Sequence, residues 1–259
     1  MLWSLFENPA YFLLMIPAVL IALVVHEVSH GYAAYLCGDN TAKAYGRLTL
    51  NPLKHLDPFG AIMMMLTGFG YAKPVPVNYR NLRKPRRDIA LVSLAGPLSN
   101  LLLALIACVL YFVILLVYAS SAEVRAETVA AGLRWLPSPA VMYDQAGLMS
   151  LLFMGEAPTL LAAFMEFLAL FASVNVGLAV FNLIPLPPLD GSKILGSLLP
   201  PQTAARYLRI EYYTRFVFLG IVLVSWLSPT LSDILFWPLE FLRSGILNLY
   251  QSLLLLLLF

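Results

Sequence analysis

The stretch PAYFLLMIPAVLIALVVHEVSHGYAAYLC, residues 9–37, decides the fold class of this chain. It is apolar over more than the roughly 20 residues that an α-helix needs to cross the hydrocarbon core of a bilayer. It nevertheless carries His26, Glu27 and His30 in its second half. Because ionisable side chains are costly inside a membrane, the stretch predicts a membrane helix that bears a functional site.

The composition extends this prediction to the whole chain. Of its 259 residues, 61% are hydrophobic and only 12% are charged, about half the charged fraction of a typical soluble domain. Open sheets do not survive in lipid, so the framework must be helical. We therefore predict an all-α membrane protein, a polytopic helical bundle that forms a single membrane-embedded domain over residues 1–259. About five membrane helices are expected, at residues 9–37, 89–118, 159–181, 216–231 and 241–259.

The segment that joins the first two predicted helices, residues 38–88, is rich in proline, glycine and asparagine, which are typical of turns. Its middle part, residues 59–71, is apolar but short and contains three glycines. Such a stretch is too short for a membrane span. It predicts a re-entrant or interfacial hairpin that packs on protein.

The basic residues indicate the orientation. Thirteen of the sixteen lysines and arginines fall in two segments, residues 43–87 and 193–215. Cytoplasmic loops of membrane proteins carry an excess of Lys and Arg. We expect the loops at 38–88 and 190–215 to be cytoplasmic and the N-terminus to lie outside.

The sequence does not support nucleic-acid binding or a disulfide-stabilised fold. The chain has no basic stripe with interleaved aromatic residues, so no nucleic-acid partner is expected. Cys37 and Cys108 each lie in or beside an apolar run, and two lone cysteines make no disulfide framework. We expect both to be small buried hydrophobic residues.

His26-Glu27-Val28-Ser29-His30 is the His-Glu-x-x-His pattern of zinc proteases. Positions four apart lie on one face of a helix, so His26 and His30 can bind one ion there. Glu27 lies between them and can take a proton from an attacking water. The alternative is a chance occurrence of polar residues, which the apolar surroundings disfavour.

A catalytic zinc usually has three protein ligands. The third histidine, His55, lies in a loop of the first basic segment. Asp190 is the better candidate, because it ends the run Asn182–Gly191, NLIPLPPLDG, at the end of the third predicted helix. The second half of the first helix lies at a similar depth. The prolines predict an extended backbone in this run, and a plain turn residue before Gly191 remains the alternative for Asp190.

Three motifs come in a fixed order along the chain: His26–His30, then Gly96-Pro97-Leu98-Ser99-Asn100, then Asn182–Gly191. Together they resemble the site-2 protease family of intramembrane metalloproteases, over about Val24 to Leu195. The lack of room for an inserted soluble domain resembles the minimal branch of that family. Many members carry a second glycine after Asp-Gly, whereas this chain has Ser192.

The resemblance implies that His26, His30 and Asp190 ligate one zinc ion and that Glu27 is the general base. It also implies that Asn182 helps to hold the substrate or the developing oxyanion. The expected reaction is hydrolysis of peptide bonds in a membrane-spanning protein or peptide, within the lipid bilayer. A multi-pass protein of a bacterial-type inner (plasma) membrane is the expected setting.

Several alternatives stay open at this point. The chain could instead be a non-catalytic zinc-binding membrane protein or a metal transporter. Asn100 serves either packing or chemistry. Residues 59–76 either guide an extended substrate or pack at the interface. His55 and Asp57 are expected to brace their loop.

Overall fold

The computed structural model describes residues 9–60, 72–121, 159–210, 213, 214, 216, 217, 220 and 229–258. Within these residues all regular elements are helices, and the only extended pairing is an isolated bridge between Leu56 and Ala72. The elements are α2 (Pro9–Leu36), α3 (Thr41–Ala44), η1 (Pro52–Lys54), η2 (Tyr79–Asn81), α5 (Pro85–Ser121), α8 (Thr159–Asn182), α9 (Asp190–Leu198), α10 (Pro201–Leu208) and α12 (Pro229–Leu258).

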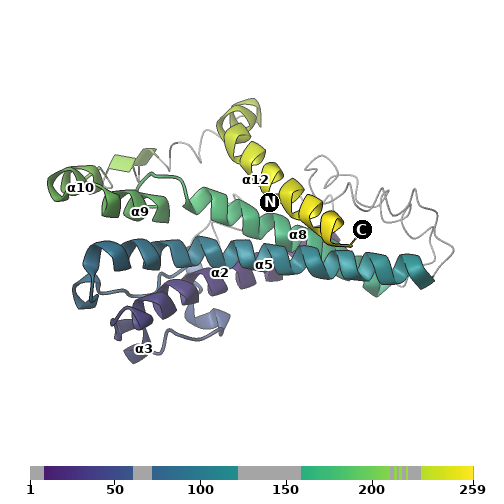
Figure 1. The fold of residues 1–259 in the computed structure, drawn as a ribbon, viewed down its shortest axis with the longest axis horizontal. Coiled ribbons are helices and arrows are strands. Elements are labelled where there is room, and N and C mark those ends of the chain that lie inside the picture. The colour runs from purple at the N-terminus through teal and green to yellow at the C-terminus, as the bar shows by residue number, and fades with distance from the viewer. Residues whose placement is uncertain are drawn as a thin grey trace.

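Three of the described helices, α2, α5 and α8, are long and apolar enough to cross a membrane. They match the spans predicted at residues 9–37, 89–118 and 159–181, so this part of the prediction is confirmed. The three pack against one another, and α5 runs antiparallel to α2 and α8 (Figure 1). The chain is therefore a multi-pass membrane protein.

Small side chains allow the three helices to approach closely. Ala18 of α2, Ala104 of α5 and Ala172 of α8 are fully buried in the shared core. Helix pairs in membranes are commonly joined through such residues, because they let the backbones come together. Large apolar side chains such as Leu102 and Phe164 are exposed on the outside of the bundle, where lipid would cover them.

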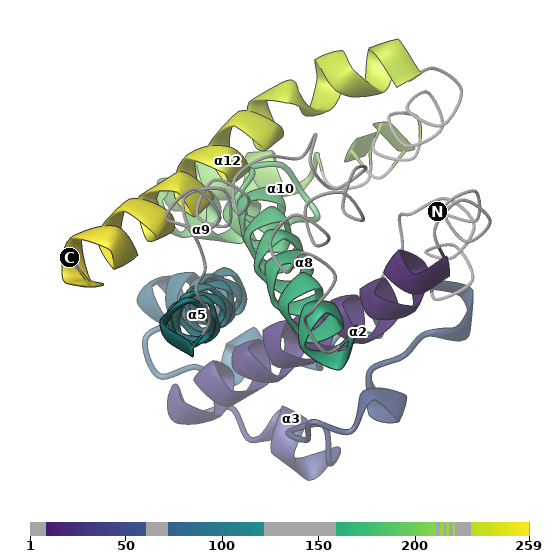
Figure 2. The ribbon, with the colours of Figure 1, turned by 90° about the vertical axis from the view of Figure 1, so that its right-hand side faces the viewer.

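The last helix, α12, differs from its prediction. It begins at Pro229, well before residue 241, so the predicted boundary is wrong and residues 229–231 belong to α12. Asp233, Pro238 and Glu240 interrupt the apolar run in the sequence, but the helix continues through them. It packs against α8 and α5 (Figure 2).

Other predicted elements fall largely outside the described residues. Most of the predicted fourth helix, 216–231, lies there, and so does the predicted hairpin from residue 61 to residue 71. The count of about five membrane helices and the hairpin remain predictions.

The short helices gather at one end of the bundle. There α2 and α8 end, α5 begins, and α3, α9 and α10 lie beside them (Figure 1). Both basic segments, 43–87 and 193–215, are attached at this end, as the charge pattern predicts. Residues 183–189, between α8 and α9, are not helical, as the prolines predict, but they form turns and bends, so the predicted extended backbone is wrong. The Pro187–Pro188 peptide bond is cis. This turn brings the start of α9 back against α5.

Candidate metal centre

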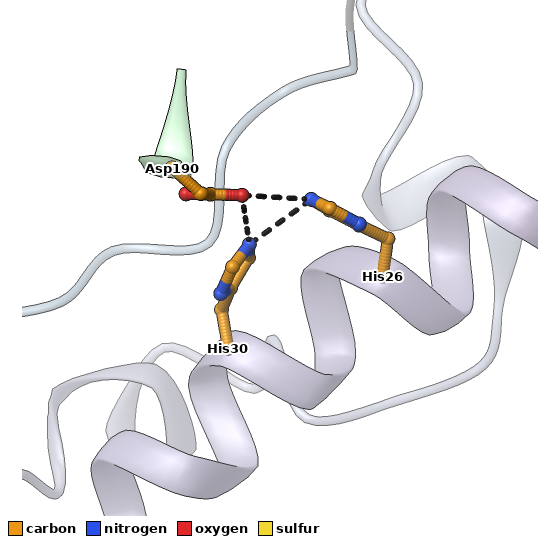
Figure 3. Close-up of side chains that lie close together, drawn as sticks. All are labelled: His26, His30 and Asp190. Carbon is orange, nitrogen blue, oxygen red and sulfur yellow. Dashed lines mark hydrogen bonds and ion pairs between the residues drawn. The ribbon is translucent and has the colours of Figure 1, made fainter. Parts of the chain in front are cut away.

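Three side chains predicted as metal ligands meet at this end of the bundle. His26 and His30 lie one turn apart on α2, and Asp190 is the first residue of α9 (Figure 3). The Asp190 Oδ2 atom lies 3.2 Å from His26 Nε2 and 3.0 Å from His30 Nε2. The two Nε2 atoms are 3.0 Å apart. These residues are the one group of three His, Cys, Asp or Glu side chains, within the described part of the chain, that could hold a metal ion.

The outer nitrogen of each imidazole is occupied by a partner. His30 Nδ1 lies 2.7 Å from the backbone oxygen of Val92, and His26 Nδ1 lies 2.6 Å from Asn100 Oδ1. A carbonyl oxygen only accepts hydrogen bonds, so each Nδ1 carries the hydrogen and donates it. Each Nε2 then presents a lone pair to the centre, as a metal-binding histidine must.

The donor set fits a divalent cation. Two Nε2 lone pairs and one carboxylate oxygen face one another within 3.2 Å, an arrangement that repels itself unless a positive charge lies among them. Two imidazoles and one carboxylate are a known ligand set of catalytic zinc sites. The residues present therefore fit zinc.

Two glycines allow the elements to meet. A Cβ atom at Gly96 of α5 would lie 2.5 Å from His30 Nε2 and 2.6 Å from His26 Cε1. A Cβ atom at Gly191 would lie 2.2 Å from the Leu183 oxygen. Any larger side chain at either position would push α5 or α9 away from the centre. This explains in physical terms why glycines stand in the second and third motifs.

Asp190 is held in place by its own helix. Ser192 is buried, and its hydroxyl donates to the Leu189 oxygen at 2.7 Å, so the turn is intact without a second glycine. Lys193 Nζ donates to Asp190 Oδ1 at 3.4 Å, which leaves Oδ2 for the centre. Burial raises the pKa of Asp190, whereas the positive charge of Lys193 beside it lowers that pKa. Lys193 thus favours the ionised form of the carboxyl group that a metal ligand needs.

Glu27, which follows His26 on α2, is held by a loop segment. Its Oε2 atom accepts a hydrogen bond of 2.9 Å from the backbone N–H of Val75. In the run Pro74-Val75-Pro76 only Val75 has a backbone N–H, because proline has none. The only backbone N–H of this three-residue run therefore donates to Glu27.

Two features hold that segment against α2. A Cβ atom at Gly31 would lie 2.7 Å from a Val75 methyl group, so glycine is needed for this approach. The Arg47 guanidinium donates to the backbone oxygens of Lys73 and Pro74, at 2.8 and 3.3 Å. Lys73 in turn donates its N–H to the His55 oxygen at 2.7 Å.

Other predicted site residues lie apart from the centre. Asn182 ends α8, and its Nδ2 donates to the Leu178 oxygen one turn earlier, at 3.0 Å. His55 is buried, and its Nε2 lies 2.8 Å from the Thr49 oxygen. Asp57 accepts a bond from the Gly60 N–H. These contacts bind the loop to itself, as expected of braces.

Sequence reasoning missed two partners of the centre. Asn175 of α8 is fully buried and hydrogen-bonds Asn100, and Val75 contacts Glu27. Asn175 carried the same signal as the histidines, a polar residue within an apolar span. The signal for Val75 was its position as the sole backbone donor between two prolines.

Known proteins are similar to this chain over most of its length. The chain matches peptidase family M50 over residues 14–225. Two similar relatives carry the name "Putative zinc metalloprotease". YwhC of Bacillus subtilis (strain 168) is 40% identical over 93% of this chain and 94% of its own length. Rip2 of Mycolicibacterium smegmatis is 26% identical over 89% of this chain and 74% of its own length. No solved structure matches at a significant level.

Proposed function

This chain belongs to peptidase family M50 and is an intramembrane zinc metalloprotease, and we propose that His26, His30 and Asp190 hold one zinc ion while Glu27 is the general base. The convergence of the three ligand atoms from α2 and α9 carries this proposal. Zinc bound there would polarise the scissile carbonyl and activate water for attack. The site is then of the His-Glu-x-x-His type.

Glu27 performs the proton transfers in this proposal. It takes a proton from the attacking water and passes it to the leaving amine. The Val75 N–H holds Oε2, which orients the carboxylate and leaves Oε1 for the proton. Lys193 places a positive charge beside Asp190 and so balances the negative charges of the site.

Asn182 is proposed to stabilise the developing oxyanion. Preorganised amide donors at such a position contribute substantially to catalysis. One Nδ2 hydrogen of Asn182 is used on the Leu178 oxygen, and the second is the one that would reach the substrate. The half-buried position of Asn182 at the end of α8, just before the turn to Asp190, supports this role.

The proposed substrates are membrane-spanning proteins or peptides. A substrate helix must unwind before its backbone can be cut, and an extended segment of enzyme beside the base would help it to do so. Residues 73–77 form neither helix nor strand, and Val75 within them contacts Glu27. We propose an inner (plasma) membrane location with the N-terminus outside and both basic loops cytoplasmic, as the positive-inside rule implies.

The geometry favours catalysis over transport of a metal. A transporter offers ligands along a path, whereas the described residues contain one candidate metal cluster, at one depth. A non-catalytic binding protein would have no need of a carboxylate held beside that cluster.

Two variants test the proposal on the purified full chain. Glu27→Gln should keep zinc at about one ion per chain and should lose cleavage of a membrane-protein substrate by about 10²- to 10⁴-fold, the usual effect of removing a general base. The double variant His26→Ala, His30→Ala should lose both zinc and activity. Cleavage by Glu27→Gln at the wild-type rate would contradict the mechanism, and full zinc content in the double variant would contradict the metal site.

A further inference from the structure

The two histidines of the centre are held by different kinds of partner. His30 Nδ1 faces a backbone carbonyl, that of Val92, which can only accept. His26 Nδ1 faces the side-chain amide of Asn100 at 2.6 Å. An amide offers either an oxygen or an NH2 group, so the hydrogen position on His26 depends on how Asn100 is turned.

Two backbone carbonyls fix the direction of the amides. Asn175 Nδ2 lies 2.8 Å from the Phe171 oxygen, and Asn100 Nδ2 lies 3.1 Å from the Ala22 oxygen. Turning either amide over would bring two oxygens together at these distances, which is repulsive. Asn175 therefore presents its oxygen to Asn100 Nδ2, at 2.8 Å, and Asn100 presents its oxygen to His26.

We propose that Asn100 and Asn175 are positioning residues that hold His26 as the Nδ1–H tautomer. The direction of the hydrogen bonds leaves the lone pair of His26 Nε2 aimed at the centre. Both asparagines are fully buried, so each amide depends on its protein partners for hydrogen bonds. This inference rests on the proposed zinc site, and it assigns to α5 and α8 a part in building that site.

The rival explanation is that the pair only joins helices. Asn100 on α5 and Asn175 on α8 do link the two spans, and polar pairs of this kind hold membrane helices together. In that case zinc affinity would fall only as far as the bundle is destabilised. The two roles can be separated, because they use different atoms of Asn100: Oδ1 serves His26, whereas Nδ2 serves Ala22 and Asn175.

Two substitutions at position 100 separate these atoms. Asn100→Asp keeps an oxygen for His26 and places another oxygen against the Ala22 and Asn175 oxygens, so the fold should suffer and zinc binding should persist. Asn100→Leu removes both groups: it takes the acceptor from His26 and leaves the Ala22 and Asn175 oxygens without this donor, but it places no oxygen against them. It should bind zinc about 10- to 100-fold more weakly, the usual effect of losing a group that orients a metal ligand. Tyr250→Phe is the matched control, because it removes another bond to α5, from Tyr250 to the Leu101 oxygen.

The experiment measures zinc affinity by competition with a chelator, and thermal stability, on the full chain in detergent. The expected result is a crossed pattern: Asn100→Asp is the less stable variant but keeps its affinity within about threefold, and Asn100→Leu loses affinity. Tyr250→Phe should bind zinc like the wild type. Wild-type affinity in Asn100→Leu, or affinities that follow stability in both variants, would overturn the inference.

Nitrogen NMR of the metal-free protein gives a second readout, because the chain has only three histidines. The His26 signals should show the hydrogen on Nδ1 in the wild type and a mixture of tautomers in Asn100→Leu. A hydrogen on Nε2 in the wild type would overturn the inference. If the wild type itself binds no zinc, both the proposed function and this inference fail. If the wild type binds zinc and substitutions of Asn100 do not change the affinity, only this inference fails.

Discussion

The proposed metal ligands and the proposed base are held by different kinds of structure, and we call their surroundings the metal side and the base side of the site. On the metal side, His26 and Asp190 are fixed by side chains and turns of buried helices, and the Asn100 and Asn175 amides beside them are fully buried. On the base side, Glu27 is held by the backbone of a loop segment at Val75. Sites on packed helices are held more rigidly than sites on loops. We infer that the proposed metal site is preformed, whereas the side chain of the proposed base, which reaches from α2 to a loop, can shift when substrate binds.

The largest expected effect comes from the metal side. Asp190→Ala removes a ligand and leaves two imidazoles facing each other 3.0 Å apart. We expect zinc content near zero and cleavage below detection, measured by metal analysis and a substrate assay. Glu27→Gln, the base-side counterpart, should lose cleavage alone. Full zinc content in Asp190→Ala would show that Asp190 is not needed to hold the metal.

Gly96→Ala tests whether the close approach of α5 to the two histidines is needed for zinc binding. Its new methyl group would lie 2.5 Å from His30 Nε2, and overpacking of this kind typically costs about 1–3 kcal/mol. We expect weaker zinc binding together with a lower unfolding temperature. The control is Gly177→Ala on α8, where the nearest atom to the added carbon is Arg243 Cδ at 3.7 Å, an ordinary contact. Equal effects of the two substitutions would show that the close approach at Gly96 is unimportant.

Arg47→Met tests the base side. It frees the Lys73 and Pro74 oxygens, each of which accepts a hydrogen bond from a charged group worth about 1.5–3 kcal/mol. The Val75 N–H should then hold Glu27 less firmly, so cleavage should fall by about tenfold while zinc affinity stays unchanged. Lys43→Met is the control, since among the described contacts the Lys43 ammonium meets only Tyr35, through its hydroxyl and its ring. Loss of zinc from Arg47→Met would show that the two sides are not separate.

The sequence predicted the metal side better than the base side, for a physical reason. His26 and His30 are related by helix geometry alone, so their spacing places them together. Asp190 could be placed because α2 and α8 end at the same side of the membrane, which charge and span lengths indicate. The spans α2, α5 and α8 follow from long apolar runs.

The base-side contact and the last helix could not be predicted in the same way. The meeting of Val75 with Glu27 depends on where a loop folds, and no periodic pattern encodes that. The start of α12 at Pro229 was missed because hydropathy reports solvent preference, while a helix continues through polar residues such as Asp233 when neighbouring helices support it. The pairing of Asn100 with Asn175 required the register of α5 against α8, which apolar runs leave undetermined.

The smallest expected effect concerns the loop that carries the base-side segment. Asp39 is fully buried after α2, and its carboxylate accepts hydrogen bonds from Thr41, Asn78 and Asn81. Burial raises the pKa of Asp39, but these hydrogen bonds lower it more, so the folded-state pKa lies below the usual 3.8. A lowered pKa stabilises the fold above the unfolded-state pKa, and that stabilisation disappears as the pH falls through the folded-state value.

Asp39→Asn should therefore lower the free energy of unfolding by about 1 kcal/mol near neutral pH. The difference from the wild type should stay constant above about pH 5, since Asp39 is ionised there in both states, and should shrink below pH 3.8. Thermal unfolding across this range measures it, with Asp57→Asn as the control, because within the described part of the chain Asp57 accepts only the backbone bond from Gly60. A difference that grows as the pH falls would mean that Asp39 does not hold residues 78–81 as a carboxylate. The segment at residues 73–77 would then owe its position to Arg47, Gly31, His55 and Glu27, without help from Asp39.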